Sequence, residues 1–292
     1  MEHKQHEVLP LTQQGVIHRT TPNNDSLSKY FKEAFSQKMR DKVTYQRFAS
    51  HIVVATIIGL IYYHVGNEAS LVMRNANCIH TVICATLSAW IPSFIKSSFE
   101  RSRLLRDGLS FKNTMVFYDS FVDITFQIIF SAVFAYIIYG LTSQPLEFKR
   151  IHMFSCICVL TSLISQDLGL LIGIGLNKIG GLIVGISSTI FLILFSGFVF
   201  NSETPVYLQW PKYISFTHYG FEGAILSIYG MDREAITCSE AYCHFRHPIK
   251  ILKVMSMNSA EYWIDFLALI GIFIVLRTTN YLVLRWRFPS KG

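Results

Sequence analysis

Residues 179–200 read IGGLIVGISSTIFLILFSGFVF, a run of 22 residues without a single Asp, Glu, Lys or Arg. A helix of about 20 mainly apolar residues is long enough to cross the roughly 30 Å hydrocarbon core of a bilayer. The composition agrees, because 51% of the 292 residues are apolar and only 15% are charged, against about 25% in soluble domains. The same composition excludes a soluble domain and a disordered chain. Six Cys in 292 residues are too few for a disulfide-rich scaffold. The sequence indicates an integral membrane protein.

Five further stretches resemble this run. Three of them, residues 48–66, 75–95 and 124–144, also hold no Asp, Glu, Lys or Arg. The fourth contains only Asp167, and the last holds Asp265 and Arg277. We therefore predict an all-α membrane protein with six transmembrane helices, at about residues 48–66, 75–95, 120–140, 151–176, 179–200 and 263–284. Residues 201–262 are predicted to form a re-entrant, partly helical external cap.

The basic residues predict the orientation of these helices. An even number of spans places both termini on one side, where the short loops and the termini together carry 17 Lys and Arg. The two short loops on the other side carry three, Arg74, Lys149 and Arg150. Because short cytosolic loops are enriched in Lys and Arg, both termini of this multi-pass protein are expected in the cytosol.

The N-terminal residues are expected to remain outside the bilayer. Residues 1–27 predict a flexible leader or linker, and the absence of an apolar run before residue 48 predicts no cleavable signal peptide. From Leu27 a helical pattern places Tyr30, Phe31 and Phe35 on one face. A basic amphipathic elbow helix on the inner membrane surface and a solvated helix packed on a partner domain both fit this pattern. The membrane domain is assigned to residues 28–292.

Catalytic motifs are not found. The phosphate-binding loop G-x-x-x-x-G-K-[ST] requires a Gly-Lys dipeptide, which does not occur in the chain. Ser187 and Asp167 each lack the partner residue that an intramembrane protease requires. We therefore expect no catalytic residue, no bound metal and no cofactor in the chain itself.

The second half of the chain carries a specific pattern of aromatic residues and glycines. The run LFSGF at residues 194–198 is followed by Pro205, Tyr207, Leu208, Trp210, Tyr213, Ile214, Ser215, Phe216, Tyr219, Glu222, Tyr229 and Gly230. This pattern resembles the fifth span and external region of ABCG-type half transporters. Residues 220–234, GFEGAILSIYGMDRE, most resemble their White-like branch, which exports sterols and lipids. The resemblance extends over residues 27–288.

The resemblance implies an architecture and a function. Such half transporters carry an N-terminal ATPase domain before a six-span domain of the ABC-2 type, and two copies dimerise around a central path. This chain would be the membrane half of an ATP-driven lipid or sterol exporter in the plasma or endosomal membrane, as a fragment or an orphan subunit. ATP and Mg²⁺ would then bind only to a nucleotide-binding domain missing from these residues. The alternative is a truncated, non-transporting subunit that dimerises with an intact half transporter and regulates it.

The expected partners are the membrane, a second half transporter, and a lipid or sterol, with no nucleic acid. Candidate residues for the substrate path are small or apolar and belong to two spans: Ala85, Ser88, Ile186, Ile190 and Leu194. Phe198 and Val199 are candidates for an apolar plug toward the outside. The alternative for each of these residues is simple packing between helices.

The first cytosolic loop is the candidate for coupling to an ATPase domain. By resemblance, Glu100, Arg106 and Asp107 correspond to the acidic and basic positions of the family's coupling helix. Downstream, the chain has Asp119 where the family has Lys, and residues 123–127 lack the family's Pro. The alternative is a basic loop that only fixes topology.

Two charged residues fall inside predicted spans. A charge in hydrocarbon is costly, so Asp167 and Arg277 are expected to face the bundle interior, water or a partner. A direct pair between them is one such arrangement, and snorkelling of Arg277 to the interface is another.

Cys238 and Cys243 lie in the predicted cap, in an oxidising compartment. With His244 and His247 they make the pattern Cys-x4-Cys-His-x2-His, which also offers four zinc ligands. The family resemblance implies a disulfide within the cap, while a bridge between subunits and a zinc site remain alternatives. Cys78, Cys84, Cys156 and Cys158 fall within spans and are expected to stay reduced.

Overall fold

A computed structural model of the chain describes residues 35–36, 39–107, 112–198, 210–231, 233–239, 243–257 and 260–287, without the side chains of residues 100 and 102–121. The described residues are predominantly helical, and their β pairing is one isolated parallel bridge between Glu68 and Thr237. The predicted leader lies outside the described residues, as does most of the predicted elbow helix. Phe35, on the predicted apolar face of that helix, stacks on Phe126 with ring centroids 4.9 Å apart.

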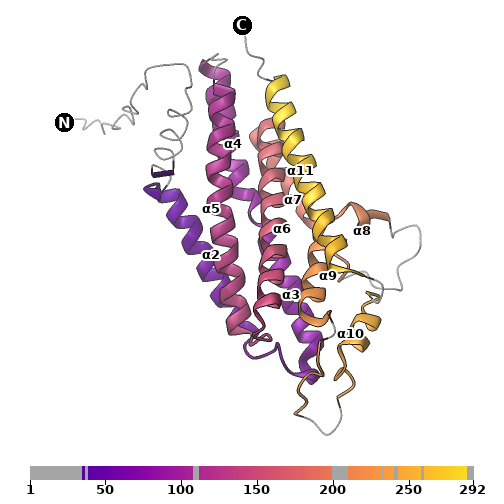
Figure 1. Ribbon diagram of the computed structural model, residues 1–292. Helices are drawn as coiled ribbons and strands as arrows, with labels where there is room; N and C mark the ends of the chain where they lie inside the picture. Colours follow the sequence, from indigo (N-terminus) through magenta and orange to yellow (C-terminus); the bar gives the residue numbers. More distant parts are fainter. Residues whose placement is uncertain are drawn as a thin grey trace, which may run out of the picture.

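Long helices run side by side through the molecule, while the short α8 lies beside the middle of the bundle and the short α10 lies toward one end (Figure 1). The long helices are α2 (Lys42–Ile61), α3 (Val72–Leu87), α4 (Trp90–Asp107), α5 (Lys112–Leu141), α6 (Phe148–Gly175), α7 (Lys178–Leu194) and α11 (Tyr262–Arg287). The shorter ones are η1 (Ala69–Leu71), α8 (Trp210–Ile214), α9 (Phe216–Tyr229) and α10 (Pro248–Val254).

Polar caps and a proline set several helix boundaries. The side chain of Asp41 accepts a hydrogen bond from the backbone N–H of Val43 and begins α2, and Asn177 caps α7 through the N–H of Gly180. Such N-caps satisfy backbone donors that have no partner within the helix. Between α3 and α4 the chain turns at residues 88–89, and Pro92 supplies no N–H to continue the helical ladder.

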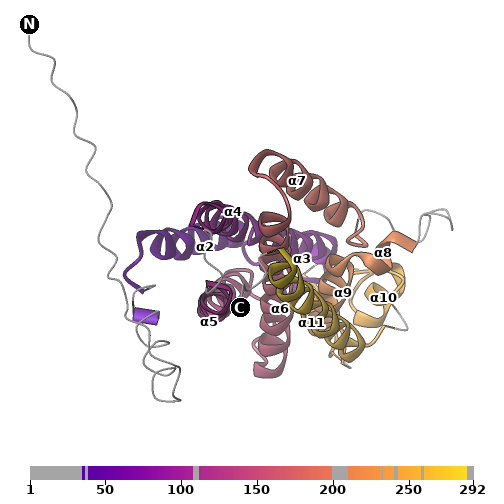
Figure 2. The same cartoon turned by 90° about the horizontal axis from the view of Figure 1, so that it is seen from above.

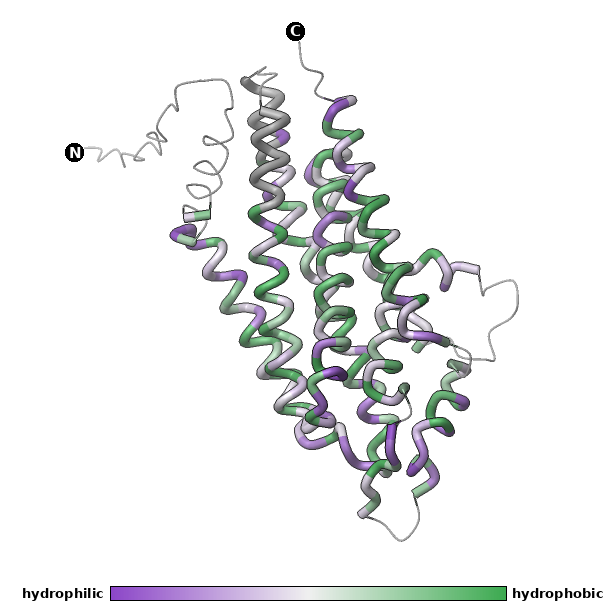
Figure 3. Tube along the Cα trace, viewed as in Figure 1, coloured by the Kyte–Doolittle hydropathy of each residue, from purple (hydrophilic) through white to green (hydrophobic). Residues whose placement is uncertain are grey.

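Among the residues that the structure describes, four helical segments are long and apolar enough to cross a membrane: Ala69–Phe99, Val122–Leu141, Phe148–Gly175 and Tyr262–Arg287. The apolar helix α7 is shorter, with 17 residues. In α2 the first half carries Lys42, Arg47 and His51, and Figure 3 shows hydrophilic residues there and hydrophobic ones toward its end. The structure therefore supports four of the six predicted spans, while the spans at residues 48–66 and 179–200 remain predictions.

Helix α6 occupies the middle of the bundle. It packs against α3, α4, α5, α7, α9 and α11, and Figure 2 shows it among the other helices, with α7 at the outer edge. Gly169 of α6 lies directly against the backbone of Trp90, and Gly185 of α7 lies against the ring of the same residue. Because any larger residue at either glycine would collide with Trp90, these two glycines set how closely α4 approaches α6 and α7.

Helix α9 is enclosed by the bundle, since 11 of its 14 residues are buried. A helix that is apolar all round must be buried, but its last carbonyl groups then need partners. Arg150, at the start of α6 and only 5% exposed, donates to the carbonyl oxygens of Ser227, Ile228, Gly230 and Met231 at 2.8–3.4 Å. The guanidinium of Arg150 therefore supplies hydrogen bonds to the last carbonyl groups of α9 and fixes the position of that helix.

Candidate functional site

A small open cleft lies between α2, α3, α5 and α6. Ala85 and Ser88, two of the predicted path residues, line it. Its other walls are unusually polar for an apolar bundle, with hydroxyl groups from all four helices and the imidazole of His51. The hydroxyl-bearing residues are Ser50, Thr86, Ser88, Ser131 and Ser162.

The predicted path residues of α7 lie elsewhere. Ile186, Ile190 and Leu194 are 48%, 55% and 40% exposed on the outer surface of the bundle. The inner face of α7 is instead formed by small residues, with Gly181 against the ring of Phe94. Within the described single chain, the two path candidates at residues 85 and 88 therefore line a polar cleft. The three candidates of α7 lie on a separate, exposed apolar face of that helix.

The predicted plug is described only at Phe198, because Val199 lies outside the described residues. The ring of Phe198 stacks on His80 of α3 at 4.7 Å and meets Phe221 of α9 edge-on at 5.6 Å. His80 also lies within hydrogen-bond distance of the Ser196 hydroxyl, at 2.9 Å. The end of α7 is thereby attached to both α3 and α9.

The predicted coupling residues lie on the last turns of α4, which ends at Asp107. The side chains of Glu100, Arg106 and Asp107 lie outside the described part of the chain. Their role in coupling stays a prediction.

A network that sequence reasoning missed lies directly beneath the cleft. Arg47 of α2 donates to the side-chain oxygen of Gln127 at 2.8 Å. The amide nitrogen of Gln127 in turn contacts the hydroxyls of Ser131 and Ser162, at 3.2 and 2.5 Å. Gln127 is fully buried, so this network joins α2, α5 and α6 in the apolar interior.

One signal in the sequence could have identified this network. Asp123, Gln127 and Ser131 recur at intervals of four residues and so occupy one face of α5. Polar residues at helical spacing within an apolar helix face other helices and not lipid. Asp123 is buried and pairs with Lys96 of α4, which extends the polar face to a fourth helix.

Asp167 and Arg277 form an ion pair between α6 and α11. The Arg277 Nη1 atom donates to Asp167 Oδ1 at 2.7 Å, and the two side chains are 15% and 2% exposed. Asn280, one turn beyond Arg277, donates to the backbone carbonyl of Asp167 at 3.0 Å. The pair and the amide together anchor α11 to the centre of the bundle.

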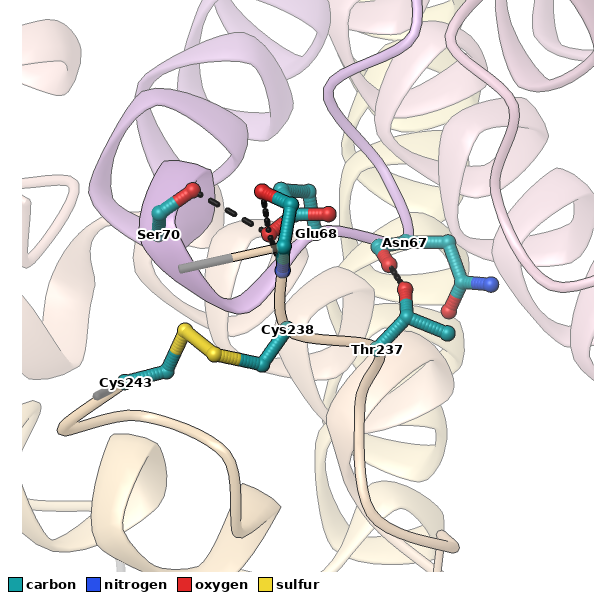
Figure 4. Close-up of a disulfide and its surroundings, with 7 residues drawn as sticks. Asn67, Glu68, Ser70, Thr237, Cys238 and Cys243 are labelled. Carbon is teal, nitrogen blue, oxygen red and sulfur yellow. Dashed lines mark hydrogen bonds between the residues drawn. A yellow bond between two sulfur atoms is a disulfide. The ribbon is translucent and has the colours of Figure 1, made fainter. Parts of the chain in front are cut away.

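Cys238 and Cys243 are joined by a disulfide within the chain, and Figure 4 shows it beside the loop that connects α2 to η1. The carboxylate of Glu68 accepts hydrogen bonds from the backbone N–H and the hydroxyl of Ser239, both at 2.9 Å. The Thr237 hydroxyl donates to the carbonyl of Asn67. We call these contacts of Asn67 and Glu68 with Thr237 and Ser239 the cap clasp. No cluster of metal-ligating side chains occurs in the part of the chain that the structure describes.

Comparison with known proteins identifies relatives for most of the chain. Residues 27–229 match the family model of the ABC-2 type transporter. Protein white of Drosophila melanogaster is 28% identical over 264 residues, which are 84% of this chain and 37% of that protein. ABC transporter G family member 1 of Dictyostelium discoideum is 25% identical over 250 residues, covering 80% of this chain and 31% of that protein.

A plant relative shows the same pattern of coverage. ABC transporter G family member 26 of Arabidopsis thaliana is 23% identical over 246 residues, covering 80% of this chain and 35% of that protein. The chain thus spans about a third of the length of these curated relatives.

The ion pair between α6 and α11 generates the first prediction. Asp167→Asn or Arg277→Gln each leaves the other charge without its partner inside the bundle. Each single variant is expected to lose about 3 kcal/mol of unfolding free energy, measured in detergent, and the double variant is expected to lose less than the sum.

Arg285→Gln is the matched control for this experiment. Arg285 lies on the same helix in its exposed last turn, so its replacement should leave stability within about 0.5 kcal/mol. Strict additivity of the two losses at Asp167 and Arg277 would contradict a direct interaction.

The cap clasp generates a second prediction, on pH dependence. The hydrogen bonds from Ser239 lower the pKa of Glu68 below its ordinary value. Because the folded-state pKa is depressed, the clasp is fully formed above the ordinary glutamate pKa of about 4.3 and weakens as the pH falls through the lowered pKa. Amide hydrogen exchange at Ser239, normalised to its intrinsic rate, is expected to accelerate only in this acidic range.

Two comparisons test this assignment to the carboxylate. Glu68→Gln should remove the acid-dependent change at Ser239. The amide of Ala69 donates to the carbonyl of Thr237 at 2.9 Å and involves no titrating group, so it should stay protected throughout. Loss of protection at Ala69 and Ser239 at the same pH would instead indicate a general opening of the cap.

Proposed function

This chain belongs to the ABC-2 type transporter family, and from that membership we propose that it forms the membrane half of an ATP-driven lipid or sterol exporter. The observation that carries the proposal is the match over residues 27–229, together with the four helical segments of the described chain that are long and apolar enough to cross a membrane. Relatives named White and ABC transporter G family members support the assignment to the ABCG type.

The proposal includes six spans, with α2 and α7 crossing the membrane beside the four longer segments. The basic residues support cytosolic termini. The beginning of α2 and the end of α11 lie toward one end of the bundle, while α10 lies toward the other (Figure 1). A cap over residues 201–262 outside the cytosol is consistent with the disulfide between Cys238 and Cys243.

The path is proposed to form between two half transporters. Helix α7 has no charged residue after Lys178 and exposes Ile186, Ile190 and Leu194. Its glycines already face the rest of the chain, so the exposed row is available to a second subunit. A path lined by such side chains fits an apolar substrate.

Energy is proposed to come from a nucleotide-binding domain outside these 292 residues, which would bind ATP and Mg²⁺. The last turns of α4, with Glu100, Arg106 and Asp107, are proposed as its docking segment. Acidic residues flank the basic ones there, which favours a specific protein contact over a purely topological role.

Reversal of one charge in this segment tests the function. Arg106→Glu, in vesicles that contain the chain together with a nucleotide-binding domain, is expected to reduce ATP-dependent lipid transport at least tenfold, because like charges at a docking surface cost several kcal/mol. Basal ATP hydrolysis is expected to persist.

The control is Arg285→Glu, an equal change on the exposed last turn of α11, which should leave transport unaltered. Unchanged coupling in Arg106→Glu would contradict the docking assignment. Absence of ATP-dependent transport in the unmodified protein would instead favour the regulatory, non-transporting subunit.

A further inference from the structure

Three basic side chains meet at the turn that joins α6 to α7. Arg101, near the end of α4, and Arg287, at the end of α11, donate to the carbonyl groups of Leu176 and Gly175, which are neighbours in the chain. Lys178 begins α7 two residues further on. The ends of four helices therefore bring three positive charges together. We call Arg101, Lys178 and Arg287 the basic cluster.

The charge of the basic cluster is not balanced by a carboxylate within the described residues. Residues 168–202 and 266–292 contain no Asp or Glu, and none of the three side chains forms an ion pair in the part of the chain that the structure describes. Partial burial and the nearby charge of Arg287 lower the pKa of Arg101, as expected where two cations lie close together. A bound anion would relieve this repulsion.

The two arginines also have hydrogen-bond donors beyond those that the helix end requires. Basic side chains commonly satisfy the last carbonyl groups of a helix, but a guanidinium carries five N–H groups. In the described part of the chain, Arg101 and Arg287 each donate one hydrogen bond, to a carbonyl at the end of α6. Further N–H groups of both side chains can therefore bind an acceptor from outside the chain.

An exposed apolar row extends from the basic cluster along α4. Ile91, Ile95 and Phe99 recur at intervals of four residues and are all exposed, and the ammonium group of Lys178 lies 4.3 Å from the centroid of the Phe99 ring. Eight residues of helix extend about 12 Å, most of the roughly 15 Å of hydrocarbon in one leaflet. Trp286, on the last turn of α11, is also exposed, and Trp is enriched at the level of the lipid headgroups.

These features together select one class of ligand. Guanidinium groups bind phosphate through paired hydrogen bonds. A choline or ethanolamine headgroup would bring a further cation toward three positive charges, whereas a glycerol or serine headgroup leaves the lipid with a net negative charge. A soluble anion or an acidic protein segment would use the basic cluster but not the apolar row.

We propose that the basic cluster binds the phosphate of an anionic phospholipid, with an acyl chain along Ile91, Ile95 and Phe99. This inference goes beyond the proposed function, because the lipid is a ligand held at the surface of the bundle and not the cargo of the path. A phosphate bound there would link the end of α4, which carries the proposed docking segment, to the ends of α6 and α11.

Native mass spectrometry of the complete 292-residue chain in detergent tests this proposal. The probes are dioleoyl phosphatidylglycerol and dioleoyl phosphatidylcholine, which share their acyl chains and differ in net charge. Phosphatidylglycerol is expected to bind with an apparent Kd at least about tenfold below that of phosphatidylcholine, and millimolar inorganic phosphate should not displace it. Equal binding of the two lipids would overturn the proposal. Displacement by inorganic phosphate would also overturn it, because charge alone would then be sufficient.

Variants of the two arginines test the site directly. Arg101→Gln and Arg287→Gln each keep an N–H donor and remove the charge, so each should weaken binding of phosphatidylglycerol about tenfold and leave phosphatidylcholine unchanged. Arg101→Lys retains the charge and should recover most of the preference. Undiminished preference in both Gln variants would contradict the site.

Arg285→Gln is the matched control. It removes the same charge from the same turn of α11, but residues two apart on a helix point to different faces, so the lipid preference should not change. A loss equal to that in Arg287→Gln would indicate a general effect of net charge and contradict the site. If an arginine variant does not fold, Lys178→Gln at an exposed position provides the comparison and should weaken phosphatidylglycerol binding about fivefold.

Association with a nucleotide-binding domain distinguishes the remaining occupant. If Arg101→Gln and Arg287→Gln release that domain while the preference for phosphatidylglycerol persists, the basic cluster is a protein contact and the lipid proposal is overturned. The lipid assay requires neither ATP nor transport, so its failure is distinguishable from failure of the proposed function.

Discussion

In an apolar helix bundle, polar groups cannot hydrogen-bond to water and must form their hydrogen bonds or ion pairs within the protein. The packing of this chain depends on that constraint. Helix α6 forms such polar contacts with four other helices. Arg150 receives the end of α9, Thr161 contacts Thr86 of α3, Ser162 joins α5, and Asp167 pairs with α11. Because dispersion alone gives lipid-embedded helices little specificity, these contacts fix which helix lies on which face of α6.

The same constraint separates two surfaces with different chemistry. Polar residues of α2, α3, α5 and α6 meet at the cleft, where hydroxyls and His51 supply hydrogen-bond acceptors. Helix α7 turns its glycines toward Trp90 and Phe94 and so exposes its branched apolar residues.

The sequence predicted the helical class and the positions of the apolar segments. A stretch of about 20 residues without charge is a local property that can be read directly from the sequence. It also predicted that Asp167 and Arg277 face the bundle interior, water or a partner, but the alternatives of a direct pair and snorkelling could be separated only by the packing of α6 on α11. The cleft was not predicted, because Ser50, Ser88 and Ser162 are far apart in sequence and share no motif. Ala85 and Ile186 were assigned to one path, although the structure places them on different surfaces.

Cysteine cross-linking tests most directly the proposal that the exposed face of α7 meets a second half transporter to form the path. In protein whose exposed Cys156 is replaced by Ser, Ile186→Cys is expected to yield a disulfide-linked dimer in membranes under mild oxidation. Leu267→Cys, on α11 and 64% exposed, is expected to remain monomeric. Efficient cross-linking at Leu267 and none at Ile186 would contradict the claim.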